Sequence, residues 1–398
     1  MATRGAEIAV AGHICLDIIP TFEGGESSLA EILVPGKLIN VGAAVTATGG
    51  TVSNTGLALH RLGIPTRLMG KVGDDLLGHA ILEILRGYDP DLAGGMLVTK
   101  GVPTSYTVVI NPPGVDRIFL HCPGANDTFG AADVPYRELR GLKLFHFGYP
   151  PLMRRMYADG GVELSSLLRQ VKEVGVTTSL DMAKPDPASE AGRAPWLQIL
   201  EQTLPHVDVF LPSVDEILYM LDRKRFDDMG PDVTARADGG LLRDLADWLL
   251  DMGAAIVVLK LGAEGLYLRT TGDTRRLAQM GNCRVADAAA WSGRELLAPC
   301  FMVSVVGTTG SGDCTIAGFL AALAAGLAPE RAMTSAVAVG ACNVEKADAT
   351  SGIPAWAQVQ ERVGRKWERR PTAVALQRWR WDEAQAIWRG PGDGGQER

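Results

Sequence analysis

The segment GTTGSGD, from Gly307 to Asp313, holds the residue types in this 398-residue chain that are best suited to chemistry. Its glycines allow the backbone amides of Gly310, Ser311 and Gly312 to point toward one spot, and the start of an apolar helix adds positive potential there. Such a group of amides stabilises the negative charge of a phosphoryl group during its transfer. Asp313 comes next, where a carboxylate could accept a proton from an attacking hydroxyl. The segment therefore predicts an anion hole beside a general base.

The same segment has a plainer interpretation, in which Asp313 caps the N-terminus of the helix and the glycines form an ordinary turn. The segment lacks the Gly-Lys-Ser/Thr of a Walker loop and the spacing of GxGxxG. Neither of these common phosphate-binding motifs therefore supports a role in phosphate binding. Both interpretations stay open for the segment alone. The choice depends on the elements that must position it.

Short apolar runs alternate with amphipathic stretches along most of the chain. The runs of strand length are 7–14, 66–73, 142–149, 177–183, 207–213 and 255–262, and helical periodicity marks 52–62, 76–86, 161–174, 216–221 and 241–252. A further strand is expected at 303–306, directly before the glycine-rich turn. Continuous apolar strands between helices predict an α/β fold with a mainly parallel central sheet covered on both faces. Right-handed crossovers make this a three-layer α/β/α architecture.

Two segments depart from this alternation. Residues 15–48 end in a strand-like run, and residues 101–122 predict a hairpin around 112–115. We expect 15–48 and 101–122 to form a small β-sheet lid over an α/β core made of 1–14, 49–100 and 123–355. The polar stretch 226–240 is expected to be an exposed loop.

The lid contains four side chains that could contact a substrate, namely Tyr106, Asp116, Arg117 and Phe119. Arg117 could pair with a carboxylate or phosphate of the substrate, or it could form a salt bridge within the lid.

The C-terminal extension, residues 356–398, is predicted to be helical with a disordered end over the last nine residues. From about residue 363 it carries four tryptophans among arginines, at 367, 379, 381 and 388. They could form a surface for nucleic acid or a partner, or they could pack on the core. The acidic chain favours packing.

The overall composition excludes several classes of function. A net charge of −7 argues against nucleic acid as a partner, and no apolar run reaches the roughly 18 residues that a membrane span needs. Glu7, His13 and Asp17 interrupt the apolar N-terminus, so we interpret it as a buried strand rather than a signal peptide. The six cysteines are scattered without a CxxC pair, which indicates free thiols and a cytoplasmic location.

The GTTGSGD segment resembles the signature of the pfkB (ribokinase-like) carbohydrate kinases, which is close to DTTGAGD, then any residue, then FxxG. Thr315 stands here where the phenylalanine is usual. The resemblance extends from about residue 7 to 355. It implies a ribokinase-like fold and transfer of the γ-phosphoryl group of ATP to a hydroxyl of a sugar-like acceptor, with Asp313 as the base and the amides of 310–312 as the anion hole.

The resemblance also implies residues for the acceptor. Gly49 and Gly50 with Asn54 look like the family's GGxxxN sugar-binding segment, and Asp17 matches a position where relatives bind sugar hydroxyls. Arg117 is the lid candidate for the same role. The segments KVGDDLLG (71–78) and GAN (124–126) are similar to family segments as well.

On the nucleotide side, LKLGAEGLYL (259–268) is similar to a strand-turn-strand unit that packs on the nucleotide in relatives. The implied nucleotide-binding residues are Ser213, Lys260, Gly262, Gly265 and Asn343. The implied metal is Mg²⁺, supported by Glu216 in a variant of the family's NxxE motif. Ser213 replaces the asparagine of that motif.

Two departures leave questions open. Gly307 stands where the signature has an aspartate that helps to hold a monovalent cation, so potassium dependence stays undecided. Asp181 begins a stretch that lacks the Asn and Arg of the DxNxR motif in relatives acting on acidic sugars, although Lys184 could substitute. His121 and His146 are interpreted as structural histidines.

Two other functions stay open beside the sugar kinase. A nucleoside kinase of the same fold would need aromatic residues around a base, and the lid offers only Tyr106 and Phe119. A catalytically silent sugar- or nucleotide-binding relative is disfavoured because Asp313 and Glu216 are both present. In relatives the lid strands often pair between subunits, so a homodimer through the lid is possible.

Overall fold

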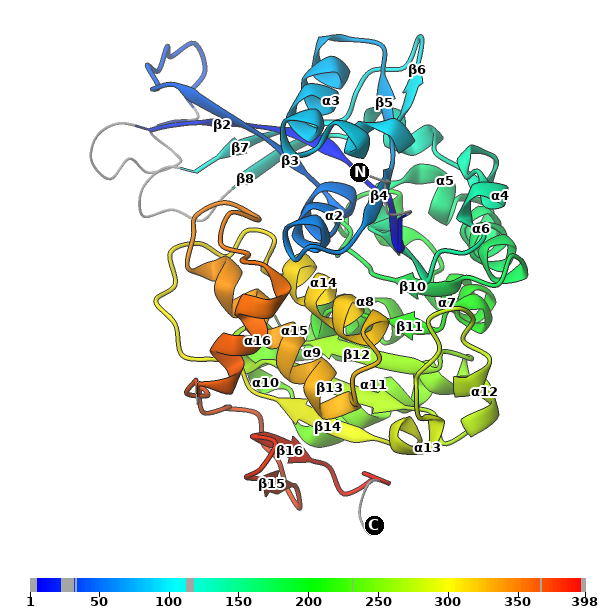
Figure 1. The fold of residues 1–398 in the computed structure, drawn as a ribbon. Coiled ribbons are helices and arrows are strands. Elements are labelled where there is room, and N and C mark those ends of the chain that lie inside the picture. The colour runs from blue at the N-terminus through cyan, green and yellow to red at the C-terminus, as the bar shows by residue number, and fades with distance from the viewer. Residues whose placement is uncertain are drawn as a thin grey trace.

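The central feature of the fold is one large sheet. The computed structural model describes residues 6–22, 32, 34–111, 118–230, 232–365 and 367–394. Within them the main sheet has ten strands, in the order β15-β16-β14-β13-β12-β11-β10-β9-β1-β4 (Figure 1). In chain order the strands are β1 (Ile8–Gly12), β4 (Thr66–Met69), β9 (Leu144–Gly148), β10 (Thr177–Leu180), β11 (Val209–Phe210), β12 (Ile256–Lys260), β13 (Leu266–Thr270), β14 (Glu295–Ala298), β15 (Arg380–Asp382) and β16 (Ile387–Arg389). The strands from β4 to β12 are parallel to their neighbours, and those from β13 to β15 are antiparallel.

Helices cover both faces of this sheet, as the sequence predicts. Alternate residues of β1 point to opposite faces, with Ile8 and Val10 in one buried cluster and Ala9 and Ala11 in the other. The first face carries α2 (Thr51–Arg61), α3 (Leu76–Tyr88), α14 (Ser311–Ala324), α15 (Pro329–Val344) and α16 (Trp356–Gly364). The second carries α6 (Val162–Glu173), α7 (Trp196–Thr203), α8 (Val214–Leu221) and α11 (Gly239–Asp251). The three-layer α/β/α architecture is confirmed.

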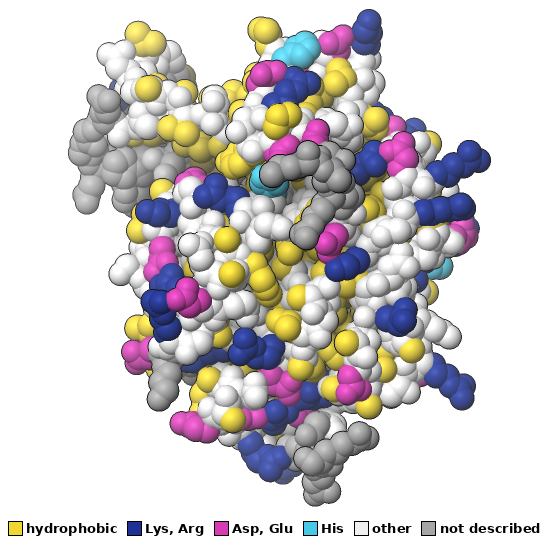
Figure 2. Space-filling model, viewed as in Figure 1, with side chains coloured by type: hydrophobic (Ala, Val, Ile, Leu, Met, Phe, Trp, Pro, Cys, Tyr) yellow, Lys and Arg dark blue, Asp and Glu magenta, His cyan; other side chains and the backbone are white. Residues whose placement is uncertain are grey.

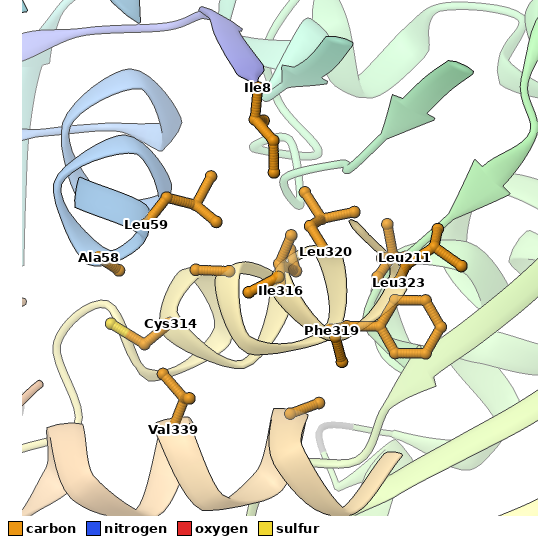
Figure 3. Packing of buried hydrophobic residues seen from close by; sticks show 14 of the residues in the cluster. Ile8, Ala58, Leu59, Leu211, Cys314, Ile316, Phe319, Leu320, Leu323 and Val339 are labelled. Carbon is orange, nitrogen blue, oxygen red and sulfur yellow. The ribbon is translucent and has the colours of Figure 1, made fainter. Parts of the chain in front are cut away.

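Helix α14 is enclosed by protein. Figure 3 shows its side chains Ile316, Phe319 and Leu320 packed among residues of the sheet and of α2, with Val339 of α15 on the other side. The helix is apolar around most of its circumference because it contacts protein on nearly every side. This packing fixes the position of its first turn, where Asp313 lies.

A second sheet forms the lid that the sequence predicts. Its order is β3-β2-β7-β8, with β2 (Cys15–Pro20), β3 (Ala44–Gly49), β7 (Tyr106–Ile110) and β8 (Ile118–Cys122), and it projects from the core at the upper left of Figure 1. Strands β7 and β8 pair antiparallel, as expected for a hairpin. The predicted turn at 112–115 lies outside the described residues.

Three local predictions are wrong. The run 66–73 divides at Gly70, so that β5 (Lys71–Gly73) leaves the main sheet and pairs with β6 (Leu97–Thr99). Residues 303–306 form no strand, and Val305 and Val306 are exposed. The expected loop at 226–240 contains helical turns instead.

The shorter helices are α4 (Tyr136–Leu139), α5 (Arg154–Tyr157), α9 (Arg223–Met229), α10 (Val233–Arg236), α12 (Thr274–Ala278) and α13 (Ala288–Trp291).

The C-terminal extension is helical only in α16. Strands β15 and β16 follow and extend the main sheet beyond β14, because the edge of β14 offers unpaired backbone groups. Trp379 is buried with its ring 6.0 Å from that of Tyr267, so it packs on the core as the acidic composition favours. Lys/Arg and Asp/Glu side chains are intermixed over the face shown in Figure 2.

The end of the extension is held by buried charges, contrary to the predicted disorder of residues 390–394. Asp393 is 6% exposed and lies 2.7 Å from Nε of Arg294, which is 3% exposed. Arg294 also pairs with Glu330, and Arg389 lies 3.0 Å from Asp393. No helix in the part of the chain that the structure describes is long and apolar enough to cross a bilayer.

Replacing Asp393 tests this network. Asp393→Asn leaves Arg294 without a full partner, so we expect the free energy of unfolding to fall by about 3 kcal/mol in denaturant titrations at pH 7. Arg294 lowers the pKa of Asp393 against the opposing effect of burial. The stabilisation is therefore present above about pH 3.9, the ordinary value for Asp, and is lost as pH falls through the lower pKa of the folded state.

Glu361→Gln is the control for Asp393→Asn, because it removes an exposed ion pair with Arg365. Its effect on the free energy of unfolding should stay below about 1 kcal/mol. Equal losses in the two variants would contradict a stabilising role for the buried network.

Candidate active site

Polar side chains gather at one edge of the main sheet. His13 follows β1, Tyr149 follows β9, Asp181 follows β10, and Ser213 lies just beyond β11. Lys260 is the last residue of β12. Since these strands are parallel, their carboxyl ends lie at the same edge, which is where open α/β sheets bind ligands.

Asp313 lies at this edge in the first turn of α14. Its buried carboxylate accepts hydrogen bonds from Nδ2 of Asn54 at 2.9 Å, the hydroxyl of Tyr149 at 2.7 Å and the hydroxyl of Thr55 at 3.2 Å. All three donors come from other elements. By contrast Asp75 accepts a hydrogen bond from an amide of its own helix, α3. The geometry therefore favours a role for Asp313 in the site over a role as helix cap.

Tyr149 is neutral and donates its hydroxyl proton to Asp313 in a hydrogen bond. Burial and the nearby carboxylates of Asp313 and Asp181 raise the pKa of its hydroxyl well above the ordinary value. Its backbone has a φ of 66°, which side-chain-bearing residues rarely adopt, so the end of β9 is held in an unusual conformation. The proton of Tyr149 stays on its oxygen and points to Asp313.

A buried ion pair lies next to the predicted anion hole at 310–312. Nζ of Lys260 is 2.6 Å from Oδ1 of Asp181. A Cβ placed on Gly312 would lie 3.9 Å from Nζ, so the ammonium group is beside the first turn of α14. Burial works to lower the pKa of Lys260, but Asp181 and Glu216 outweigh it and raise the pKa. Lys260 is a fixed positive charge at this site.

The carboxyl of Asp181 belongs to the same cluster of charges. Burial, with help from Glu216 and Asp313, raises its pKa to about 8, while Lys260 opposes the shift. Its Oδ2 is buried without a hydrogen-bond partner in the described residues. This free oxygen is available to a ligand.

Glu216 occupies the first turn of α8. Its Oε2 accepts a hydrogen bond from the amide of Ser213 at 2.6 Å, and the carboxylate is partly exposed. Burial raises its pKa against the charge of Lys260. The described residues contain no group of three His, Cys, Asp or Glu that could hold a metal by itself. A Mg²⁺ ion here would take most of its ligands from water and substrate, which is common for this ion.

A pocket of about 310 Å³ opens beside Gly312 and Lys260. It is lined by Lys260, Gly262, Ala263, Gly265, Leu266, Cys300, Phe301, Met302, Val303, Val305, Thr308, Ser311, Gly312, Thr315, Val337, Gly340, Ala341, Val344 and Arg370. Its walls are mostly apolar, and its polar end is the start of α14. This combination suits a flat aromatic base with a charged tail.

The structure brings together some of the predicted nucleotide residues and separates others. Lys260, Gly262 and Gly265 line the pocket. Ser213 lies next to Lys260, through a bridge between their backbones, but outside the lining. Asn343 is buried under the loop 346–350, where its Nδ2 donates to the carbonyl of Ala349 at 2.7 Å.

The predicted acceptor residues lie close together, and one of them contacts Asp313. Gly50 is the residue before α2 and has a φ of 86°, and a Cβ there would lie 2.5 Å from the carbonyl oxygen of His13. A Cβ on Gly49 would overlap the carboxylate of Asp17. Asn54 reaches Asp313 with its amide nitrogen, while its Oδ1 is buried and unpartnered among the described residues. Asp17, Gly49, Gly50 and Asn54 therefore form one surface.

Histidines connect this surface to the lid. His13 lies with its ring 6.1 Å from that of Tyr149 and its Nε2 3.4 Å from Nε2 of His121. Nδ1 of His121 lies 3.0 Å from the hydroxyl of Thr107, which is level with Asp17 on the neighbouring strand. Burial and His121 lower the pKa of His13 to about 3, so His13 is neutral. His146 is buried against Ser179 at 2.9 Å, as a structural histidine would be.

The remaining candidates have separate positions. Arg117 and Asp116 lie outside the described residues. Lys184 lies 3.7 Å from Asp215. At Gly307, a Cβ would lie 2.9 Å from the Cα of Ala347, so the backbone of 346–347 fills the space where relatives carry an aspartate.

Sequence reasoning missed Tyr149, Thr55 and His13 as members of the site. It noted Asp181 only because the stretch that begins there lacks the Asn and Arg of the DxNxR motif. One signal could have found three of them. His13, Tyr149 and Asp181 each directly follow a parallel strand of the structure and lie near the end of the predicted runs 7–14, 142–149 and 177–183, which is the position where such folds place ligand-binding residues.

Comparison with known proteins identifies the family and the fold. The model of the family described as pfkB family carbohydrate kinase matches residues 6–356. The Uncharacterized sugar kinase of Archaeoglobus fulgidus is 27% identical over 300 residues, covering 75% of this chain and 98% of that protein. Fructokinase-2 of Oryza sativa subsp. japonica is 27% identical over 217 residues, which cover 52% of this chain but only 58% of that protein.

The structure of Arabidopsis thaliana Ribokinase complexed with Ribose and ATP matches with a TM-score of 0.65 and 18% identity, over 90% of this chain and 98% of that chain. The ribokinase-like fold is confirmed.

Two glycines of the anion hole should respond differently to alanine. Gly310 has a φ of 70°, and a Cβ there would lie 2.9 Å from Cβ of Ala349, so Gly310→Ala should lower the free energy of unfolding by about 1–3 kcal/mol. Gly312 lies inside α14 with room for a Cβ, so Gly312→Ala should change it by less than about 1 kcal/mol. Denaturant titration of both variants measures the difference. Equal losses would contradict the left-handed turn at Gly310.

Proposed function

Since this chain belongs to the pfkB family of carbohydrate kinases, we propose that it transfers the γ-phosphoryl group of ATP to a hydroxyl of a sugar or sugar-like polyol. One observation carries the proposal. The buried carboxylate of Asp313 lies in the first turn of α14, where it accepts hydrogen bonds from Asn54 and Tyr149, and its chain neighbour Gly312 lines the pocket. A base in this position can serve an acceptor and a nucleotide at the same time.

In the proposed reaction Asp313 takes the proton of the acceptor hydroxyl. A bond forms between that oxygen and the γ-phosphorus, while the bond from the γ-phosphorus to the bridging oxygen of ADP breaks. The amides of Gly310, Ser311 and Gly312, with the ammonium of Lys260 beside them, stabilise the charge on the transferring group. ADP and the phosphorylated acceptor then leave.

The neighbours of Asp313 orient it for this step. Asn54 and Tyr149 both donate to Oδ2, whereas Oδ1 accepts only the longer bond from Thr55 in the described residues. Oδ1 is therefore the oxygen with more capacity to receive a proton. Asn54 also supplies the acceptor surface, since its Oδ1 is unpartnered and can accept a hydrogen bond from a sugar hydroxyl.

Mg²⁺, when bound with the nucleotide, would neutralise phosphate charge, and Glu216 is the carboxylate placed to support its water ligands. Glu216 fits this role because it is partly exposed at the edge of the sheet, with its Oε2 held by the amide of Ser213.

Replacing the base tests the mechanism. Asp313→Asn keeps the size of the side chain but removes the proton acceptor, so the turnover number should fall by about 10²–10⁴ in an assay of acceptor-dependent ADP release. Asp273→Asn is the matched control, because Asp273 caps helix α12 through the amides of Arg275 and Arg276. It should leave turnover unchanged. Activity of Asp313→Asn within about tenfold of the wild type would exclude this role.

A panel of acceptors separates the proposal from the alternatives. We expect ADP release to be stimulated by sugars or sugar-like polyols. Stimulation by nucleosides alone would indicate a nucleoside kinase of the same fold. Nucleotide binding without stimulation by either class would indicate a binding protein that has lost catalysis.

The lid supports a further proposal, that two copies of the chain pair through it. Val45 on β3 and Phe119 and Leu120 on β8 are each more than half exposed, and β3 and β8 are the two edges of the small sheet. Light scattering should give the mass of a dimer, and Leu120→Glu should shift it toward the monomer because it puts a charge on that edge. A monomeric wild type at micromolar concentration would contradict this pairing.

A further inference from the structure

The C-terminal extension reaches the nucleotide pocket. The family match ends at residue 356, yet residues 368–370 pair with the pocket segment 300–302. The amide of Arg370 donates to the carbonyl of Cys300 at 2.7 Å, and the amide of Met302 donates to the carbonyl of Glu368 at 2.9 Å. One wall of the pocket is therefore backed by a strand-like segment from outside the family domain.

Side chains of the extension hold this wall in place. The indole of Trp367 stacks on Phe301 with ring centres 4.2 Å apart, and its Nε1 donates to the carbonyl of Met302 at 3.0 Å. The guanidinium of Arg369 lies 3.9 Å from the centre of the Phe301 ring and donates to the carbonyl of Pro299 at 2.9 Å. Phe301 is 4% exposed as a result.

The extension also contacts the turn between β12 and β13. The hydroxyl of Thr372 donates to the carboxylate of Glu264 at 3.0 Å, and the amide of Ala373 donates to the same oxygen. Glu264 belongs to the turn whose glycines, Gly262 and Gly265, line the pocket. Two sides of the pocket are thus joined by residues 367–373.

Among the described residues, Arg370 is the one member of the extension that lines the pocket. Its amide pairs with the carbonyl of Cys300, which lines the pocket as well. It is exposed, and none of the ion pairs of the described residues involves it. Lys260 is the other charged residue of the lining, and no acidic residue contributes to it.

The charge of Arg370 and the lining of the pocket indicate which part of a nucleotide Arg370 would contact. The apolar lining from Phe301, Val337 and Ala341 suits a base, whereas a guanidinium pairs best with phosphate oxygens, often through two hydrogen bonds. The backbone of Arg370 pairs with Cys300. The Sγ of Cys300 lies 3.5 Å from the carbonyl of Gly262, which is two residues after Lys260. Both cations therefore border the same pocket.

We propose that Arg370 binds the phosphate groups of the nucleotide, so that the C-terminal extension completes the nucleotide site and favours nucleoside di- and triphosphates over nucleosides. This inference rests on the proposed function, because it takes the pocket to be the site of ATP. It makes Arg370 a determinant of nucleotide affinity and leaves the proton transfer to Asp313.

Calorimetric titration of the full chain with ATP, ADP and adenosine tests this inference. Arg370→Ala should weaken ATP and ADP about tenfold, the loss expected for one charge-assisted hydrogen bond, and leave adenosine unchanged. Arg370→Lys should lie between the wild type and the alanine variant, because a lysine keeps the charge without the paired donors. Added salt should reduce the difference between wild type and variant.

Arg380→Ala is the matched control, since Arg380 is an exposed arginine of the same extension outside the pocket lining. It should bind all three ligands as the wild type does. Unchanged ATP affinity in Arg370→Ala would overturn the inference, and so would an equal loss for adenosine, which indicates a damaged wall instead. A wild type that binds ATP but phosphorylates no acceptor would overturn only the proposed function, and a wild type that binds no ATP would overturn both.

Discussion

The carboxylate of Asp313 is the group on which the rest of the site depends. Burying a carboxylate is unfavourable unless hydrogen-bond donors replace the water that it loses. Here Asn54 and Thr55 from α2 and Tyr149 from the end of β9 supply those donors. Helix α2, helix α14 and strand β9 must therefore meet at one point. The apolar contacts of α14 with α2, α15 and the sheet fix that meeting (Figure 3).

The features that the sequence predicts well are those with a local signal. Alternation of apolar runs and helical periodicity indicates the layered sheet, and the glycine-rich turn indicates the start of the apolar helix α14. Tyr149 escapes such reasoning because it lies 164 residues from Asp313 along the chain, and only the fold brings the two together. The pairing of Asp181 with Lys260, 79 residues apart, is hidden for the same reason.

Two of the wrong predictions, at 303–306 and in the extension, share a physical cause, which is that a strand needs a neighbour. Residues 303–306 are rich in valine, yet they find no strand to pair with, and the amide of Val306 bonds the carbonyl of Val344 instead. The extension shows the reverse case. The extension, rich in arginine and tryptophan, is predicted to be a helix. The edge strand β14 has unpaired backbone groups, however, and β16 pairs with them. Side-chain propensity is a weaker influence than an available edge.

Both proposed substrate surfaces border segments outside the α/β core. The proposed acceptor surface at Gly49 and Asn54 borders the lid sheet, whose strands β2 and β3 lie between β1 and α2 in the chain and whose strands β7 and β8 follow β6. The nucleotide pocket borders the extension, which follows α16. The two cations of that pocket differ in the same way. Lys260 is held by the buried carboxylate of Asp181, so its position is fixed by the core, whereas Arg370 is exposed on an added segment. A chain with this fold can therefore alter its affinity for either substrate by changing an added segment, while the core that holds Asp313 stays the same.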